Sequence, residues 1–259
     1  DKADGIPIDV AFGVASRVDP GFLAHAATAL SEEGIATIKI GDSTGELFPL
    51  EVHRLFKQVM EQVPSDVVIA AHLHNDYGLA LANYLETLRL GVRMVCSSWL
   101  GLGERVGLAA TEQILMALAG DPEQLAERLG LDSELWLSPP DLKRVTPIAQ
   151  EVSRMLNIPL KMTDPVISPT MNHIATGAYF NNPMAFKPFD PEDVLGIGPK
   201  LVLSHLSNHS IVESYANQLG YSLSKDEIRT TLKWVKTYAY QHNNSIIPIP
   251  AFKEFLSGL

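Results

Sequence analysis

Two histidines, His72 and His74, lie two residues apart where an apolar run ends and an amphipathic helix pattern begins. Side chains two apart on a strand point the same way, so both imidazoles are expected on one face. In parallel α/β folds, ligands bind at the carboxyl ends of the strands. Two imidazoles followed by Asn75 and Asp76 suit a divalent metal. Alternatively, one histidine caps the sheet and the other hydrogen-bonds to a loop.

Polar residues also follow the two preceding strands expected along the chain. In the stretch "GDSTGE", Asp42, Ser43 and Thr44 could bind a carboxylate or carbonyl oxygen of a substrate. The alternative is a polar turn that caps the next helix, and the residue types favour it. Arg17 follows the first expected strand, where a surface or loop-anchoring role is favoured.

A glycine-rich loop, "WLGLGERVG", follows the fourth expected strand. Its glycine spacing is not that of a dinucleotide-binding fingerprint, but its backbone amides could hold an anion. The loop carries Glu104 and Arg105, which either take part in chemistry or form a solvent-exposed ion pair. All four strand ends therefore carry polar residues, as the rim of an active site does.

The elements that must position these residues repeat as strand then helix. Parallel βα units are expected, forming an open sheet or part of a barrel. A closed (β/α)8 barrel needs eight strands in about 250 residues. The sequence predicts only four, at 6–14, 35–41, 66–72 and 92–99.

Capping residues and apolar spacing define the helices of these units. Asp19 is expected to cap a helix that begins at Pro20, Pro49 opens the second helix, and Asp76 can cap the third. A further helix is expected at 107–119. The inward faces are expected to hold Phe22, Ala26 and Ala29, then Val52, Leu55, Phe56 and Val59, then Leu81, Leu85 and Leu88.

The second part of the chain has a different residue pattern, without alternating strands and helices. A proline-rich joint begins at 137, and mainly helical segments with long loops follow. Ser224 and Glu227 form a capping box ahead of a helix whose apolar face includes Val235. We therefore expect two regions, 1–136 and 137–259.

Composition restricts the class of protein further. The 259 residues are 46% hydrophobic and 19% charged, which is ordinary for a globular chain. The net charge of −10, without long basic runs, argues against nucleic acid and anionic membrane as partners. Cys96 is the single cysteine, which rules out a disulfide framework within the chain and favours the cytoplasm. No apolar run reaches membrane-spanning length.

The segment "HLHNDYGLALANYLETLRLGVRMVCSSWLGLGER" resembles a signature shared by metal-dependent acyl-CoA condensing enzymes. These are 2-isopropylmalate, homocitrate and citramalate synthases and, more distantly, 3-hydroxy-3-methylglutaryl-CoA (HMG-CoA) lyase. The stretches "ASRVDPGFL" and "GDSTGELFPLEV" resemble the preceding strand ends of this family in the same order. Two later stretches, beginning at Met171 and Leu201, resemble its accessory subdomains.

The resemblance implies a TIM barrel of which 1–136 forms the last four βα units, followed by a mainly helical accessory region at 137–259. It implies condensation of acetyl-CoA with a 2-oxo acid and release of CoA. His72 and His74 would ligate a divalent metal (Mg, Mn or Zn) that polarises the ketone of the 2-oxo acid.

The resemblance also suggests roles for other residues. Ser43 stands where the family usually has a threonine that touches the 2-oxo acid, and we group it with Thr44 and Arg17 as substrate-binding. Glu104 would lie near the metal and order its loop. The expected catalytic residues are Glu104, Arg105 and His173, the last from the accessory region.

Three departures from the family pattern qualify these roles. The N-terminal strand with its Asp-Arg-Glu motif is missing, and Leu108 replaces an asparagine that ligates the metal. The accessory His-Glu-Ser-Gly-Ile-His motif keeps only its last histidine, His173. We expect another chain to supply the first half of the barrel, within a homo- or hetero-oligomer; alternatively, the sequence omits a leading segment. The alternative functions are carbon–carbon cleavage of the HMG-CoA lyase type and a non-catalytic paralogue or subunit.

Overall fold

The fold was established from a computed structural model. The structure describes residues 7–130, 136, 138–175, 177, 187–243 and 246–259. They form two compact units, of which the first comprises 1–160 with 165–167 and the second 161–164 with 168–259. Among the described residues, no helix combines the length and apolarity needed to cross a bilayer.

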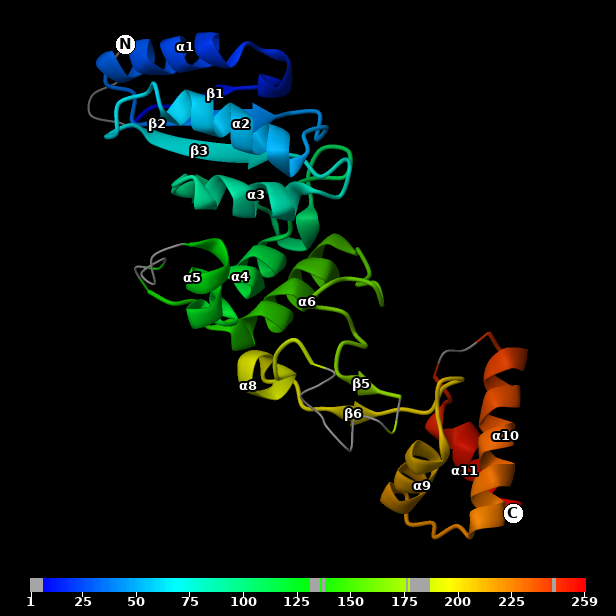
Figure 1. Ribbon diagram of the computed structural model, residues 1–259. Helices are drawn as coiled ribbons and strands as arrows, with labels where there is room; N and C mark the ends of the chain where they lie inside the picture. The colour runs from blue at the N-terminus through cyan, green and yellow to red at the C-terminus, as the bar shows by residue number, and fades with distance from the viewer. Residues whose placement is uncertain (1–6, 131–135, 137, 176, 178–186, 244–245) are drawn as a thin grey trace. The chain divides into compact units, whose positions relative to one another are not determined.

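The first unit begins with four strand-then-helix repeats, as the sequence predicts (Figure 1). The strands are parallel and lie side by side in chain order. Sheet and helices alternate as β1 (Asp9–Phe12), α1 (Pro20–Glu32), β2 (Thr37–Asp42), α2 (Pro49–Met60), β3 (Val68–Leu73), α3 (Ala80–Arg89), β4 (Met94–Val95) and α4 (Thr111–Ala119).

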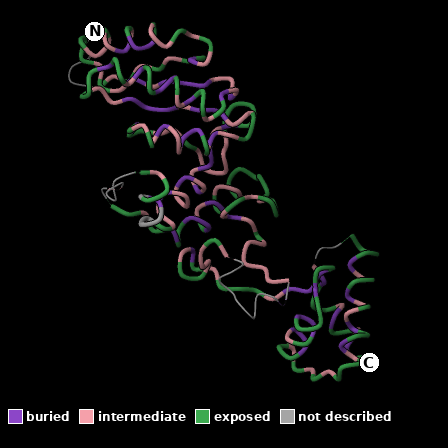
Figure 2. The backbone as a smooth tube through the Cα atoms, viewed as in Figure 1, coloured by how far each residue is buried: buried purple, intermediate pink, exposed green. Residues whose placement is uncertain are grey.

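The two faces of this sheet have different surroundings. Alternate residues of β2 and β3, including Ile38, Ile40 and Ile69, belong to a hydrophobic core shared with the helices. The buried backbone of β2 and β3 is visible in Figure 2. On the other face, Asp9 of β1 and Met94 of β4 are exposed. The helices therefore cover one face of the sheet.

Helix α1 confirms the predicted cap but not the predicted inward face. The Asp19 carboxylate accepts a hydrogen bond from the Phe22 N–H at 2.9 Å, and the helix begins at Pro20. However, the Phe22 residue is 59% exposed, and the buried residues are Leu23, Ala24 and Ala27. The prediction is wrong because several alanines give this helix two similar apolar stripes.

Helix α2 begins at Pro49 and buries the predicted Val52, Leu55, Phe56 and Val59. Helix α3 differs from expectation, since Leu81, Leu85 and Leu88 are only partly buried while Ala80, Asn83, Tyr84 and Thr87 are buried.

Asp76 does not cap α3. The helix begins at Ala80, whose N–H donates to Asn75 Oδ1 at 3.0 Å. The Asp76 carboxylate instead binds Arg105 at 2.7 Å.

The fourth strand and its helix are shorter than predicted. β4 is only Met94–Val95, and α4 begins at Thr111, after the glycine-rich loop. The first unit ends with α5 (Pro122–Leu129) and α6 (Val145–Leu156), and α6 contacts α4. The first unit thus continues past residue 136, and the expected division at 136/137 stays a prediction.

The second unit has its own core. Ser224 Oγ accepts from the Glu227 N–H, and the Glu227 carboxylate accepts from the Ser224 N–H at 2.7 Å, which confirms the predicted capping box. Val235 and Phe252 are fully buried in this core. The elements are β5 (His173–Ile174), α8 (Pro191–Leu195), β6 (Lys200–Leu201), α9 (His209–Gln218), α10 (Lys225–Gln241) and α11 (Ile249–Ser257).

Candidate active site

The two histidines lie together at the carboxyl end of β3. Their ring centroids are 5.3 Å apart, and the rings meet edge to face at 61°. His74 is 8% exposed, and its Nδ1 is buried without a hydrogen-bond partner among the described residues. An unpaired buried nitrogen costs free energy unless something outside the described residues binds it.

The environment of His72 favours the neutral imidazole. Partial burial, the neighbouring His74 and then the positive charge of Lys39 all lower the pKa of His72. A neutral imidazole keeps a lone pair on one ring nitrogen, which is the form that binds metal ions. The His72 side chain is therefore suited to metal ligation at neutral pH.

A buried tyrosine from α3 fixes the end of β3. The Tyr84 hydroxyl accepts from the Leu73 N–H at 2.8 Å and donates to the Leu73 carbonyl at 3.3 Å. The backbone of the next residue, His74, pairs with Leu108 of the glycine-rich loop, and its N–H donates to the Asp42 carbonyl at 3.2 Å. These contacts hold the backbone of Leu73, which lies between the two histidines, and the backbone of His74.

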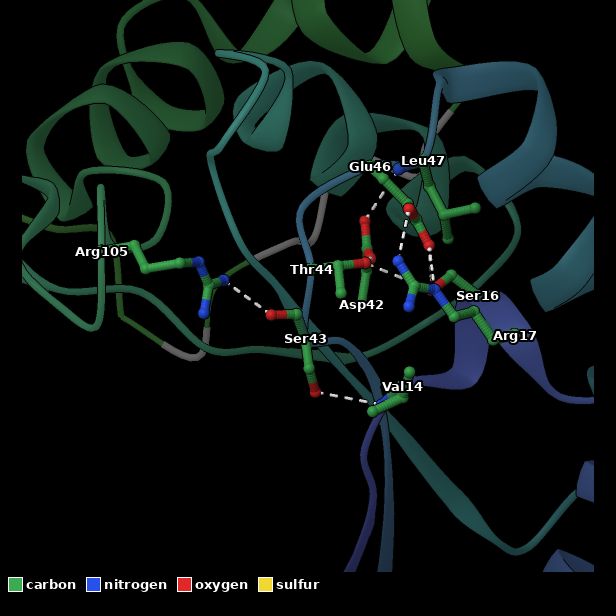
Figure 3. A network of polar contacts seen from close by, with 9 residues as sticks. All are labelled: Val14, Ser16, Arg17, Asp42, Ser43, Thr44, Glu46, Leu47 and Arg105. Carbon is green, nitrogen blue, oxygen red and sulfur yellow. Dashed lines mark hydrogen bonds and ion pairs between the residues drawn. The ribbon is translucent and has the colours of Figure 1, made fainter.

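The loop after β2 is organised by Asp42, which is 1% exposed. Its carboxylate accepts from the Leu47 N–H at 3.0 Å and from the Thr44 hydroxyl at 3.2 Å. Ser43 Oγ accepts from the Val14 N–H at 3.0 Å (Figure 3). Asp42 and Thr44 thus form a polar turn, although the capping carboxylate of α2 is that of Glu51, and the substrate-binding role expected for Thr44 stays a prediction. The Ser43 hydroxyl keeps its proton to donate.

Arg17 anchors the loop after β1 to the loop after β2 (Figure 3). Its guanidinium contacts both carboxylate oxygens of Glu46, at 3.0 and 3.1 Å, and Ser16 donates to the same carboxylate at 3.1 Å. The hydrogen bond from Arg17, then those from Ser16 and Thr44, lower the pKa of Glu46 to about 2. The structure therefore places Arg17 in the loop-anchoring arrangement.

Arg105 joins three loops. Its guanidinium binds the two Asp76 oxygens at 2.7 and 3.0 Å and the Ser43 carbonyl at 2.6 Å. The neighbouring Glu104 lies 3.7 Å from it, and the Glu104 side chain is 80% exposed. The main partner of Arg105 is thus Asp76 rather than Glu104, and the catalytic roles expected for Glu104 and Arg105 stay predictions.

The glycines of the loop after β4 are required by close packing. Gly107 has φ +78°, and a Cβ there would lie 1.8 Å from the Gly101 carbonyl oxygen. Gly107 also accepts through its carbonyl from the Asn75 N–H at 2.9 Å. The loop therefore folds back onto itself directly beside the histidine-bearing end of β3.

His173 belongs to the second unit, so its expected part in catalysis stays a prediction. Its Nδ1 is buried without a hydrogen-bond partner among the described residues. Burial is the main cause that lowers the pKa of His173, with a smaller effect from Lys200.

Sequence reasoning missed three residues that shape the site: Lys39, Tyr84 and Asp76 as the partner of Arg105. Lys39 breaks the apolar run "IATIKIG", and period-two alternation along that strand would have placed it on the face opposite Ile38 and Ile40. The partnership of Tyr84 with Leu73 has no local signal in the sequence.

The residues that could hold a metal are the two histidines. In the part of the chain that the structure describes, no three His, Cys, Asp or Glu side chains form a metal-binding group. Leu108, which lies beside His74, has no ligating atom in its side chain. The chain therefore offers an imidazole pair, and further ligands must come from water or from outside the described residues.

Parallel βα units with polar residues gathered at the carboxyl ends of the strands define an α/β protein whose candidate site lies at that edge. The HMGL-like family model matches residues 2–152. The chain belongs to this family of TIM-barrel α/β proteins.

Known proteins extend this similarity. The 2-isopropylmalate synthase of Synechococcus sp. (strain CC9311) is 30% identical over 83% of this chain and 41% of its own length. That of Caldanaerobacter subterraneus subsp. tengcongensis is 29% identical over 87% of this chain and 56% of its own. The chain thus spans about half the length of the curated relatives it matches.

A solved structure, the HMG-CoA lyase of Bacillus subtilis, resembles this chain with a TM-score of 0.50. It is 22% identical, over 62% of this chain and 53% of its own. At this identity the similarity concerns the fold.

Proposed function

We propose that this chain takes part in a metal-dependent condensation of an acyl-CoA, acetyl-CoA in the first instance, with a 2-oxo acid, releasing CoA. The observation that carries the proposal is the imidazole pair at the end of β3, with rings 5.3 Å apart and one buried nitrogen unpartnered among the described residues. The relatives named 2-isopropylmalate synthase support the class of reaction.

In this proposal, His72 and His74 hold the metal, which is Mg, Mn or Zn. When bound, the metal supplies Lewis acidity to the ketone of the 2-oxo acid. Ser43 lies in the neighbouring loop, and its hydroxyl accepts from the Val14 N–H, which leaves its proton for a substrate oxygen. Thr44 and Arg17, which we group with it as substrate-binding residues, shape the same loops.

Arg105 positions these loops through Asp76 and the Ser43 carbonyl. The exposed Glu104 is left to approach the bound substrates. We propose that Glu104, Arg105 and, from the second unit, His173 complete the catalytic set.

We further propose that the four βα units described are the last four of a barrel and that four more units complete it. The exposed face formed by Asp9, Ala11 and Met94 supports this, because inward faces of barrel strands are normally covered. The missing units would belong to another polypeptide or to a longer form of this one, in an oligomeric and cytoplasmic enzyme.

A second candidate function is a non-catalytic paralogue that binds a 2-oxo acid or stabilises a partner. Leu108 favours it, because a leucine beside His74 removes one place for a metal ligand. The intact histidine pair favours the enzyme.

The test is release of CoA thiol from acetyl-CoA, measured across several 2-oxo acids in the protein purified in its native assembly. We expect metal-dependent thiol release that His72→Ala lowers by about a hundredfold or more, as loss of a metal ligand should. The matched control is His25→Ala, which removes an exposed histidine from α1. Unchanged turnover and metal content in His72→Ala would contradict the proposal.

A further inference from the structure

Glu112, in the first turn of α4, is a buried acidic residue that is only 2% exposed. Its Oε2 accepts a hydrogen bond from the Leu100 N–H at 3.1 Å. Leu100 has φ +60°, in the left-handed region that is unfavourable for a residue with a side chain. The Glu112 carboxylate therefore holds a backbone turn that is strained.

This turn lies at the base of the glycine-rich loop, residues 98–110. Ser98 pairs with Ala110, and the Thr111 N–H donates to the Ser98 carbonyl at 2.8 Å, so the two ends of the loop are joined. Glu112 is the next residue of the chain, and its side chain reaches back into the loop to Leu100. The loop is thus attached to α4 at its base by both backbone and side chain.

Backbone contacts continue from the turn to the histidine pair. Gly101, which follows Leu100, accepts through its carbonyl from the Leu108 N–H at 3.2 Å. Leu108 in turn pairs with His74. A shift of the turn at Leu100 would therefore be passed through Gly101 and Leu108 to the backbone of His74.

The burial of Glu112 calls for a reason beyond the stability of α4. An acidic residue in the first turn stabilises a helix through the helix dipole even when it is exposed. Burying a carboxylate is costly unless it makes good hydrogen bonds. A carboxylate also accepts a stronger hydrogen bond from an N–H than a neutral group does. The contact with Leu100 therefore indicates that Glu112 serves the loop as well as the helix.

We propose that Glu112 is a positioning residue for the candidate metal site. Through the turn at Leu100 it holds Leu108 against the backbone of His74, and so keeps the imidazole pair in place for a metal. The inference rests on the proposed function, because the metal is part of that function. Glu112 acts through the backbone of the loop.

The test is titration of the natively assembled protein with Mn²⁺, in which electron paramagnetic resonance measures the free ion. Glu112→Met keeps the length of the side chain and removes both oxygen acceptors, whereas Glu112→Gln keeps one. We expect Glu112→Met to bind Mn²⁺ about tenfold more weakly or worse, as loss of a residue that orients metal ligands does. Glu112→Gln should recover most of the affinity.

Thr87→Val is the control for a general loss of stability. Thr87 is fully buried in α3, and its hydroxyl donates to the Tyr84 carbonyl of the same helix at 2.8 Å. This variant also removes a buried hydrogen bond, but its affinity for Mn²⁺ should stay within twofold of wild type. Hydrogen exchange of the peptide that contains Leu100 is a second measurement, and it should be slow in wild type and faster in Glu112→Met.

The outcomes separate this inference from the proposed function. Wild-type affinity for Mn²⁺ in Glu112→Met, or an equal loss in Thr87→Val, overturns the role of Glu112 and leaves the proposed function standing. If Glu112→Met does not fold, rapid exchange of the Leu100 amide in wild type overturns the role instead. Absence of Mn²⁺ binding that depends on His72 in the wild-type assembly overturns both.

Discussion

At the scale of single residues, the arginines and the histidines at the edge of the sheet differ in their hydrogen-bond partners. Arg17 and Arg105 each contact both oxygens of a carboxylate on another loop. Such two-point contacts fix orientation as well as distance. In contrast, the rings of His72 and His74 contact each other, and His74 Nδ1 lacks a hydrogen-bond partner within the described residues. The arginines thus hold the loops that surround the histidines.

The Arg17–Glu46 contact predicts a pH dependence of stability. The pKa of Glu46 is lowered from its ordinary 4.5 to about 2 in the folded chain. Its contribution is therefore present above pH 4.5 and is lost as the pH falls from 4.5 towards 2. Glu46→Gln should lower the melting temperature at pH 7, and its difference from wild type should disappear by about pH 2.

The control for this prediction is Glu61→Gln, which alters an exposed carboxylate 3.9 Å from Lys57. It should have a smaller effect at pH 7. A difference between Glu46→Gln and wild type that stayed constant from pH 5 to pH 2 would show that the ion pair is not its source.

At the scale of elements, local signals predicted some helices well and others poorly. Asp19, Pro49 and the Ser224–Glu227 pair act within one helical turn, so their effects are readable from neighbouring residues. The apolar stripe of α2 was identified in full because charged residues separate its members. Helix α1 lacks such separation, and its buried face is shifted towards Leu23 and Ala27.

The loop after β4 depends on Gly107, which gives a test at this scale. Gly107→Ala would place a Cβ 1.8 Å from the Gly101 carbonyl oxygen at a φ of +78°. We expect the free energy of unfolding to fall by about 3 kcal/mol or more, since the loop must move as well as bear strain. Denaturant unfolding followed by circular dichroism measures this loss.

Gly78→Ala is the matched control for the backbone conformation alone. Gly78 has a similar φ of +74°, and nothing lies within 4 Å of the position of its Cβ. This variant should cost only about 1 kcal/mol. Equal losses in both variants would show that close packing against Gly101 is unimportant.

At the scale of the whole molecule, the sequence predicted the parallel βα order and the meeting of four strand ends. Hydrogen bonds between the loops, such as Arg105 to the Ser43 carbonyl, confirm that these ends come together. Ion pairs between residues distant in sequence could not be predicted, because no local pattern marks them. Asp76, for example, is expected to cap the helix that follows it but binds Arg105. The role of Tyr84 could not be predicted either, because its hydroxyl holds the end of β3 through a residue that is distant in sequence.

The face of the sheet that the helices leave uncovered carries several charged or polar residues. It carries Asp9, Lys39 and His72, which are charged or polar side chains on strands otherwise rich in apolar residues. A completed barrel would enclose them, with the histidines at its carboxyl-end edge and with Lys39 and Asp9 in the packed interior below.

The most direct measurement is anomalous diffraction from crystals of the natively assembled protein grown with Mn²⁺. The account predicts one strong manganese peak within bonding distance, about 2.0–2.3 Å, of a ring nitrogen of both His72 and His74. Saturation with Mn²⁺ that leaves no peak between these two rings, or a peak bound only by other residues, would contradict it.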